Sequence, residues 1–280
     1  AVARGFHALG RQRPDRLLAM GSYSSVGPVI AARCRGIPVV LHESNAIPGR
    51  ATCLLAPFAR AIAIHFETCR SALRHSRIVN TGMPLRPEFK TLAPRPPHPA
   101  GAPLTLLAMG GSQGAHRVND AVREAVQELH RRGVSLFIIH LAGRQDAPGL
   151  ETFYREQGVP HEVHAFYADM PALYGRADLA ISRAGAASCA ELLACGLPSL
   201  LIPYPEAARD HQTANARYLA AAGAADWLPQ AEARPDRIVA FIERVARQPE
   251  LWLKFHQAAL SLAIPNGAQR LADLVESSDA

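Results

Sequence analysis

The stretch from Ile181 to Ala216 constrains the fold more than any other part of the chain. An apolar strand ends at the beginning of this stretch, and a turn of small residues follows from Arg183 to Ala186. A helix is predicted to begin near Ser188, and the segment from Leu197 to Ile202 has the composition of a buried strand. Because a helix start built from Gly, Ala and Ser leaves its free backbone N–H groups accessible, a diphosphate can approach them closely. Glu191 lies one turn into this helix, within reach of a ribose hydroxyl.

A second glycine-rich turn strengthens this interpretation. Leu104 to Ala108 is a short apolar strand that runs into the turn Met109 to Ala115, and apolar residues then recur at helical spacing from Val118 to Leu129. Ser112 in this turn is placed to donate to a phosphate. Either turn alone is typical of ordinary strand-turn-helix packing, and GGSxG matches neither the dinucleotide fingerprint nor the P-loop. Two such turns at the same end of a parallel sheet indicate a nucleotide-diphosphate ligand.

The length of the chain favours two domains. A sequence of 280 residues, 49% of them hydrophobic, buries a sizeable core. Short apolar strands alternate with helical patterns along it, which predicts an α/β fold of two Rossmann-like, doubly wound domains. The proline-rich segment 92–103 fits neither a helix interior nor a central strand. We therefore predict a first domain over 1–91, a linker over 92–103, a second domain over 104–262 and a C-terminal helix over 263–280 that packs back on the first domain.

The charge and the cysteine content restrict the classes of binding partner and the cellular compartment that suit this chain. The net charge of +6 comes from arginine, with a local excess near the N-terminus, and suits an anionic membrane surface or a phosphorylated substrate. Few aromatic residues and the lack of a nucleic-acid-binding motif argue against nucleic acid. Five scattered cysteines without CxxC spacing predict a reduced compartment and no metal site. No apolar run approaches the roughly 20 residues that span a bilayer, so we expect at most peripheral membrane association.

The first residues resemble the end of an amphipathic helix. Val2, Phe6 and Leu9 recur at helical spacing, with no strand before them. Because a doubly wound domain normally opens with a buried strand and its ligand-binding loop, we expect the sequence as given to begin inside a domain. Its arginine-rich face with Phe6, Leu9 and Leu17 is a candidate surface for anionic lipid.

Seven short motifs follow one another along the chain. They are GSYSSVGP (21–28), HESN (42–45), TGMPLRPE (81–88), GGSQGA (110–115), FYADM (166–170), RAGAASCAE (183–191) and DHQTANA (210–216). Together they resemble the MurG family, the UDP-N-acetylglucosamine:undecaprenyl-diphospho-muramoylpentapeptide N-acetylglucosaminyltransferases that make lipid II from lipid I. The resemblance implies the GT-B arrangement of two Rossmann-like domains facing across a cleft, with the donor held mostly by the second. The resemblance also implies that roughly 70 residues of the family's first domain, with a GGTGGH loop, are missing here.

The resemblance also implies a binding site for UDP-N-acetylglucosamine (UDP-GlcNAc). Asn45 and Gln212 would contact the sugar, Arg86 and Ser112 the diphosphate, and the backbone at Tyr167 the uracil. The helix start would supply amides to the phosphate and a carboxylate to the ribose, through Ala186, Ala187, Ser188, Cys189, Ala190 and Glu191.

Plainer interpretations of these residues stay open. Asn45 also suits a turn before Pro48, Arg86 a surface position and Gln212 a helix cap. The sequence departs from the family pattern at Ser44 and at Met83, where Gln and Asn are usual, and at His211, where the family can have Gln. None of these departures removes a group that the implied donor contacts need.

The chemistry implied by the resemblance is one inverting displacement. The 4-hydroxyl of the muramic sugar attacks the anomeric carbon and UDP leaves. The helix-start amides, Ser112 and Arg86 would stabilise the departing diphosphate without a metal or other cofactor. A base must reach the acceptor hydroxyl. His42 is the nearest candidate, although a histidine just past a strand end more often has a structural role.

The resemblance implies partners and a location as well. They are UDP-GlcNAc, the lipid-linked acceptor lipid I, an anionic surface at the cytoplasmic face of the bacterial inner membrane, and other proteins of cell-wall synthesis, cell shape and division. Two alternatives remain. The chain could be a donor-binding subunit or inactive fragment that needs a separate acceptor domain. It could also be a UDP-sugar 2-epimerase on the same fold, a class that uses catalytic carboxylates, although no second acidic residue stands beside Glu191.

Overall fold

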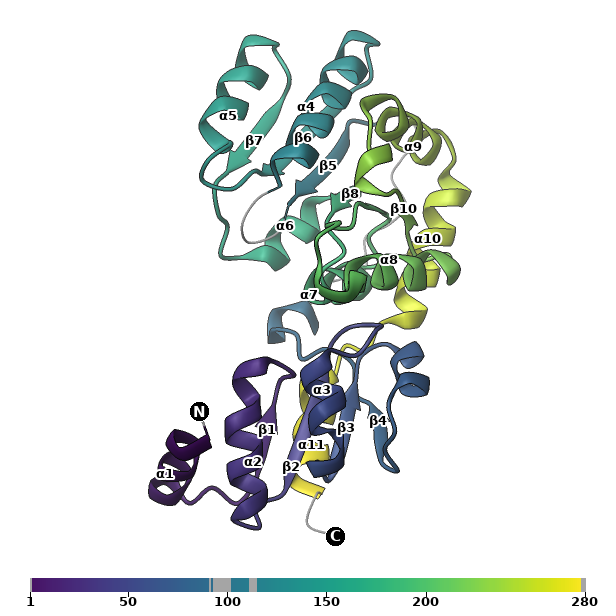
Figure 1. Ribbon diagram of the computed structural model, residues 1–280. Coiled ribbons are helices and arrows are strands. Elements are labelled where there is room, and N and C mark those ends of the chain that lie inside the picture. Colours follow the sequence, from purple (N-terminus) through teal and green to yellow (C-terminus); the bar gives the residue numbers. More distant parts are fainter. Residues whose placement is uncertain (1, 91, 93–101, 111–114, 278–280) are drawn as a thin grey trace. The chain divides into compact units, whose positions relative to one another are not determined.

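The computed structural model describes residues 2–90, 92, 102–110 and 115–277, and it consists of two compact α/β units (Figure 1). One unit holds the described residues up to Leu85 together with those from Ile264 onward, and the other extends from Arg86 to Ala263. The predicted linker, 92–103, lies mostly outside the described residues. In the described part of the chain, no helix has the length and apolar character needed to cross a bilayer.

The first unit is built on a four-stranded parallel sheet. Its strands follow one another in chain order, β1 (Leu17–Ala19), β2 (Val39–Glu43), β3 (Ala61–Ile64) and β4 (Ile78–Asn80). Its helices are α1 (Val2–Gln12), α2 (Val26–Cys34), α3 (Arg50–Leu55) and α11 (Gly267–Glu276), with 3₁₀ turns at Tyr23–Ser25, Ala56–Phe58 and Glu67–Ala72.

Alternation along β2 and β3 explains how this sheet is covered on both faces. Leu41 and Ile62 point into the core that contains α2 and α3. Val40 and Ala61, their neighbours in the sequence, point to the opposite face, where Leu271 and Val275 of α11 pack. Strands buried on both faces read as continuous apolar runs, and this is why the sequence predicted them.

The second unit has six parallel strands in the order β10-β9-β8-β5-β6-β7. The strands are β5 (Leu104–Met109), β6 (Leu136–Leu141), β7 (His161–His164), β8 (Leu179–Ser182), β9 (Ser199–Leu201) and β10 (Asp226–Trp227). The helices are α4 (His116–Arg131), α5 (Ala147–Glu156), α6 (Met170–Arg176), α7 (Ala186–Cys195), α8 (His211–Ala221), α9 (Pro235–Arg247) and α10 (Pro249–Leu262), with 3₁₀ turns at Pro87–Lys90, Ala208–Asp210 and Gln230–Glu232.

The strand order of the second unit reverses between β5 and β8. The chain adds β6 and β7 on one side of β5, then returns to add β8, β9 and β10 on the other. In open parallel sheets, ligands bind beyond the carboxyl ends of the strands at this switch point. Met109 pairs with Ser182 in the register of β5 and β8, so both strands end together. The two segments that the sequence singled out follow these two strands.

Candidate donor site at the switch point

The turn after β8 leads directly into α7. Gly185 is extended, with φ −64° and ψ 146°, and α7 begins at Ala186, two residues before the predicted start. The N-cap residue, Gly185, has no side chain with which to cap this helix start. A Cβ placed on Gly185 would meet only Ser188 Oγ, at 4.0 Å. Since neither backbone conformation nor packing within the described residues requires glycine here, the small residue leaves room for a ligand at the helix start.

Buried polar contacts hold this turn from behind. Asn215 of α8, which is fully buried, donates from Nδ2 to the Ala184 carbonyl oxygen at 3.0 Å. The buried Arg183 guanidinium points away from the turn and donates to the carbonyl oxygens of Ile202 (3.1 Å) and Pro203 (3.0 Å). These contacts fix the turn to the loop after β9. Sequence reasoning placed Arg183 in the turn but did not foresee this supporting role.

Glu191 has a hydrogen-bond partner from another element, Tyr174, and the charge of Arg86 acts on it as well. It is partly buried, and the Tyr174 hydroxyl of α6 donates to Oε2 at 3.0 Å. Tyr174 packs edge-on against Phe89 at a centroid distance of 5.7 Å, and the Arg86 guanidinium lies 5.9 Å from the Phe89 ring centroid. Burial raises the pKa of Glu191, while the Tyr174 hydrogen bond and the charge of Arg86 act against that rise.

Arg86 also connects this cluster to the segment that contains Tyr167, the residue predicted to contact uracil. Its Nη1 donates to the Ala168 carbonyl oxygen at 2.7 Å, directly after Tyr167. The Tyr167 ring packs against His164 at 4.8 Å, and the Asp169 carboxylate caps α6 by accepting from Ala172 N at 3.3 Å. The structure therefore brings together Arg86, Glu191 and the segment that carries Tyr167, which come from three separate parts of the sequence.

Gln212 lies in the first turn of α8, directly after the loop that follows β9. Its Oε1 accepts from the Tyr204 backbone N–H at 3.0 Å, and among the described residues no acceptor is seen for the amide hydrogens of Nε2. Arg209 and Asp210, just before it, have φ values of 56° and 55°. Two successive non-glycine residues in the left-handed region store backbone strain, a feature that concentrates at functional sites.

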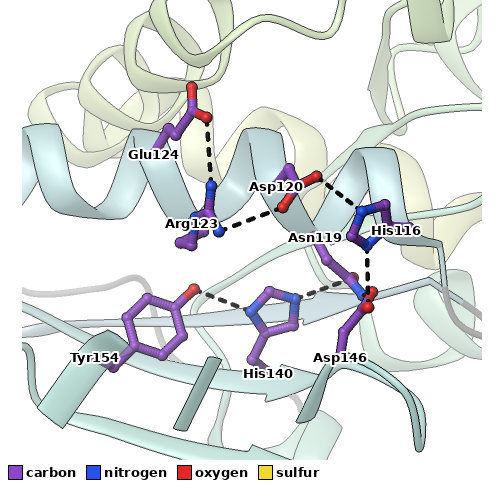
Figure 2. Close-up of polar contacts among 8 residues, drawn as sticks. All are labelled: His116, Asn119, Asp120, Arg123, Glu124, His140, Asp146 and Tyr154. Carbon is purple, nitrogen blue, oxygen red and sulfur yellow. Dashed lines mark hydrogen bonds and ion pairs between the residues drawn. The ribbon is translucent and has the colours of Figure 1, made fainter. Parts of the chain in front are cut away.

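The turn after β5 leads into α4, and its residues 111–114, including Ser112, lie outside the described residues. What the structure shows is how α4 is anchored (Figure 2). Asn119 is buried and donates from Nδ2 to the Ala142 carbonyl oxygen at 2.9 Å and to Asp146 Oδ2 at 2.7 Å. His116, at the start of α4, contacts Asp146 Oδ1 through Nδ1 at 3.0 Å.

A buried histidine completes this network. Burial lowers the pKa of His140 to about 4, so its ring is neutral at physiological pH. Asn119 already uses its amide nitrogen, so His140 Nε2 donates to Asn119 Oδ1 at 3.2 Å, and Nδ1 accepts from the Tyr154 hydroxyl at 3.0 Å. The network therefore ties α4 to β6 and α5.

His42 and Asn45 belong to the first unit, at the carboxyl end of β2. His42 is 1% exposed and donates from Nε2 to the Gly82 carbonyl oxygen at 3.0 Å. Burial lowers its pKa, partly offset by Gly82 and by the charge of Glu43. Asn45 donates to Glu43 Oε1 from its backbone N (3.1 Å) and from Nδ2 (3.3 Å).

Glu43 organises the HESN turn, a role that sequence reasoning missed. Its buried carboxylate also accepts from Gly49 N at 2.8 Å and from Thr52 Oγ1 at 2.6 Å. An acidic residue that ends an apolar strand just before a Pro-Gly turn was the available signal, since such a residue needs local donors when it is buried.

Known proteins resemble the chain over both units. Residues 105–272 match the glycosyltransferase family 28 C-terminal domain, and residues 1–64 match the N-terminal domain of that family. Two relatives are named UDP-N-acetylglucosamine--N-acetylmuramyl-(pentapeptide) pyrophosphoryl-undecaprenol N-acetylglucosamine transferase. The protein from Syntrophotalea carbinolica is 39% identical over 97% of this chain and 75% of its own length. The protein from Tolumonas auensis is 38% identical over 97% of this chain and 76% of its own length.

Solved structures also resemble this chain. MurG from Acinetobacter baumannii superposes with a TM-score of 0.83 and 29% identity, covering 99% of this chain and 78% of that one. A UDP-GlcNAc 2-epimerase from Neisseria meningitidis has a TM-score of 0.69 at 12% identity, covering 99% of this chain and 80% of that one, and so shares the fold alone. The predicted fold and family are confirmed: the chain has the GT-B glycosyltransferase fold and belongs to the MurG family within glycosyltransferase family 28.

Proposed function

We propose that this chain transfers N-acetylglucosamine from UDP-GlcNAc to the 4-hydroxyl of undecaprenyl-diphospho-N-acetylmuramyl-pentapeptide, which converts lipid I into lipid II in peptidoglycan synthesis. One observation carries the proposal. In a chain 39% identical to a transferase of that name, β5 and β8 end side by side at the switch point, and the charge of Arg86 acts on the Glu191 carboxylate of α7, the helix that follows β8. A sugar nucleotide presents a ribose diol and a diphosphate, the groups that a carboxylate and a guanidinium recognise.

The donor assignments that we propose combine the family resemblance with the contacts described above. The diphosphate would lie against the free amides at the start of α7, from Ala186 to Ser188, and meet Arg86 and Ser112. Glu191 would accept from the ribose hydroxyls, and the uracil would contact the backbone at Tyr167. The remaining amide hydrogens of Gln212 suit a sugar hydroxyl. Asn45 of the first unit is proposed as a further sugar contact.

The transfer needs a stabilised leaving group and a base. As the bond to the anomeric carbon breaks, negative charge grows on the UDP diphosphate, and helix-start amides with a guanidinium stabilise it. His42 remains the candidate base. Donation from Nε2 to Gly82 leaves the lone pair on Nδ1, and the pKa lowered by burial keeps that nitrogen unprotonated.

A transfer assay tests this function together with its donor preference. We expect the chain to move labelled N-acetylglucosamine from UDP-GlcNAc onto a lipid I analogue. It should use UDP-glucose or GDP-GlcNAc at least about tenfold less well, because UDP-glucose lacks the N-acetyl group and GDP-GlcNAc lacks the uracil, so that the protein groups that bind them lose their partners. Equal use of UDP and GDP donors would contradict the uracil assignment. Conversion of UDP-GlcNAc to UDP-N-acetylmannosamine without acceptor would indicate an epimerase, and donor binding without transfer would indicate a donor-binding subunit.

We also propose a peripheral position at the cytoplasmic face of the inner membrane. On α1, Val2 and Phe6 are exposed beside Arg4 and Arg11, a combination that suits anionic lipid. The prediction for Leu9 was wrong, because Leu9 is buried in the core of the first unit. Partnership with other proteins of cell-wall synthesis or division stays a prediction.

Binding to anionic vesicles should depend on charge. Each nearby arginine contributes about 1 kcal/mol, so Arg4→Glu/Arg11→Glu should release most of the protein that co-sediments at low salt. Raising the salt should release the parent in the same way. Arg237→Glu, at an exposed position in the second unit, is the matched control and should bind as the parent does. Salt-independent binding would show that the arginine face is not the contact.

A further inference from the structure

Tyr174 offers its only hydroxyl hydrogen to Glu191. The hydroxyl oxygen lies 3.0 Å from Glu191 Oε2 and 3.5 Å from Met109 Sδ. Because a carboxylate is a much stronger acceptor than a thioether, the hydrogen bond goes to Glu191. Burial and the neighbouring Glu191 raise the pKa of Tyr174 well above its usual value, so the hydroxyl keeps its proton and remains a donor.

The core fixes the position of this donor. Tyr174 is 1% exposed, and its ring packs edge-on against Phe89. The Asp169 carboxylate caps the start of α6, which carries Tyr174. A glutamate side chain has several rotamers, and a hydrogen bond from a fixed donor selects one of them. In the described residues, Glu191 Oε1 accepts no hydrogen bond, so it remains for a ligand hydroxyl.

The charged and titratable groups around Glu191 come from three places. Arg86 contributes a positive charge, and Tyr174 contributes the neutral hydroxyl. On α7 itself, burial raises the pKa values of Cys189 and Cys195 to about 12, so both thiols stay neutral. Glu191 is therefore the group in this cluster whose charge changes between acidic and neutral pH.

We propose that Tyr174 is a positioning residue of the donor site, which orients the Glu191 carboxylate toward the ribose diol and holds it as an anion. The inference rests on the proposed contact between Glu191 and ribose. It adds a requirement, since the carboxylate recognises ribose only in the ionised form and in the rotamer that the Tyr174 hydroxyl selects. Loss of the hydroxyl removes an interaction that opposes protonation of Glu191.

The test compares the pH dependence of UDP-GlcNAc binding in the parent and in Tyr174→Phe, by calorimetry. The diphosphate of this probe stays ionised over the whole profile. Without the hydroxyl, burial of the carboxylate is less compensated, so the loss of affinity on acidification should begin at a higher pH. On the acid limb, the part of the profile in which affinity falls with pH, we expect the variant to bind about threefold to tenfold more weakly than the parent. At mildly alkaline pH the difference should narrow but not vanish, because there the variant has lost only the orientation of the carboxylate.

Two further variants separate this role from a structural one. Tyr154→Phe also removes a buried hydroxyl, but one that bonds to His140, and it should lower the melting temperature without moving the acid limb. In Glu191→Gln the limb should disappear, and adding Tyr174→Phe to that variant should then have no effect on it. Coincident profiles for the parent and Tyr174→Phe, with a limb lost in Glu191→Gln, would overturn the role of Tyr174 and leave the ribose contact standing. A limb that persists in Glu191→Gln would overturn both.

Discussion

Replacing Asn119 with alanine should lower the free energy of unfolding by about 3 kcal/mol, because it leaves several buried polar groups without partners. The Asn119 amide satisfies the Ala142 carbonyl oxygen, Asp146 Oδ2 and His140 Nε2 at once. The Ala142 carbonyl oxygen and the His140 ring are buried, so solvent cannot replace the bonds that they lose, whereas Asp146 is only partly buried. Denaturant unfolding followed by circular dichroism measures the change.

Gln127→Ala is the matched control for this substitution. Gln127 lies on the same helix, and its Nε2 donates to Gln157 Oε1 at 2.8 Å on the surface. Water replaces that bond, so we expect a change of less than about 0.5 kcal/mol. If the two variants unfolded at the same denaturant concentration, the network around His140 would not hold α4 in place.

The fold was largely predictable because buried parallel strands have a simple signature. Apolar runs such as Val39 to Leu41 and Leu104 to Met109 must be covered on both faces, and the helical patterns between them supply the cover. The edge strands β7 and β10 were harder to predict. β7 has the sequence His-Glu-Val-His and is only partly buried, and β10 has two residues, so neither presents an apolar run.

The candidate site was predictable only in part. The glycine-rich turns and Glu191 have local patterns that reveal them, since a helix start and one helical turn fix their spacing. The partners of these residues have no such pattern. Tyr174 lies 17 residues before Glu191, and their contact depends on how α6 and α7 pack. Asn119 and His140 read as ordinary positions in a helix and a strand, and the fold alone shows that they face each other.

The family also bears on the alternatives that the sequence left open. A 2-epimerase shares the fold at 12% identity, whereas the transferase from Syntrophotalea carbinolica shares 39% of its residues over 97% of this chain. Membership in the MurG family therefore favours transfer of the sugar over epimerisation.

Glu191→Ala should weaken UDP binding about tenfold or more. Charge-assisted hydrogen bonds contribute about 1.5 to 3 kcal/mol each, and the variant loses those that the carboxylate makes with the ribose diol. Stability should change little, because the lost Tyr174 hydrogen bond is offset by removal of a partly buried carboxylate whose pKa burial already raises. Glu250→Ala, at an exposed position on α10, is the control for loss of one negative charge.

Measuring UDP affinity and melting temperature on the same samples of the parent, Glu191→Ala and Glu250→Ala tests the donor site most directly. We predict a Glu191→Ala protein that melts close to the parent and binds UDP about tenfold or more weakly, with Glu250→Ala matching the parent in both measurements. A Glu191→Ala protein that melts normally and binds UDP as tightly as the parent would contradict the ribose contact and the placement of the donor at the start of α7.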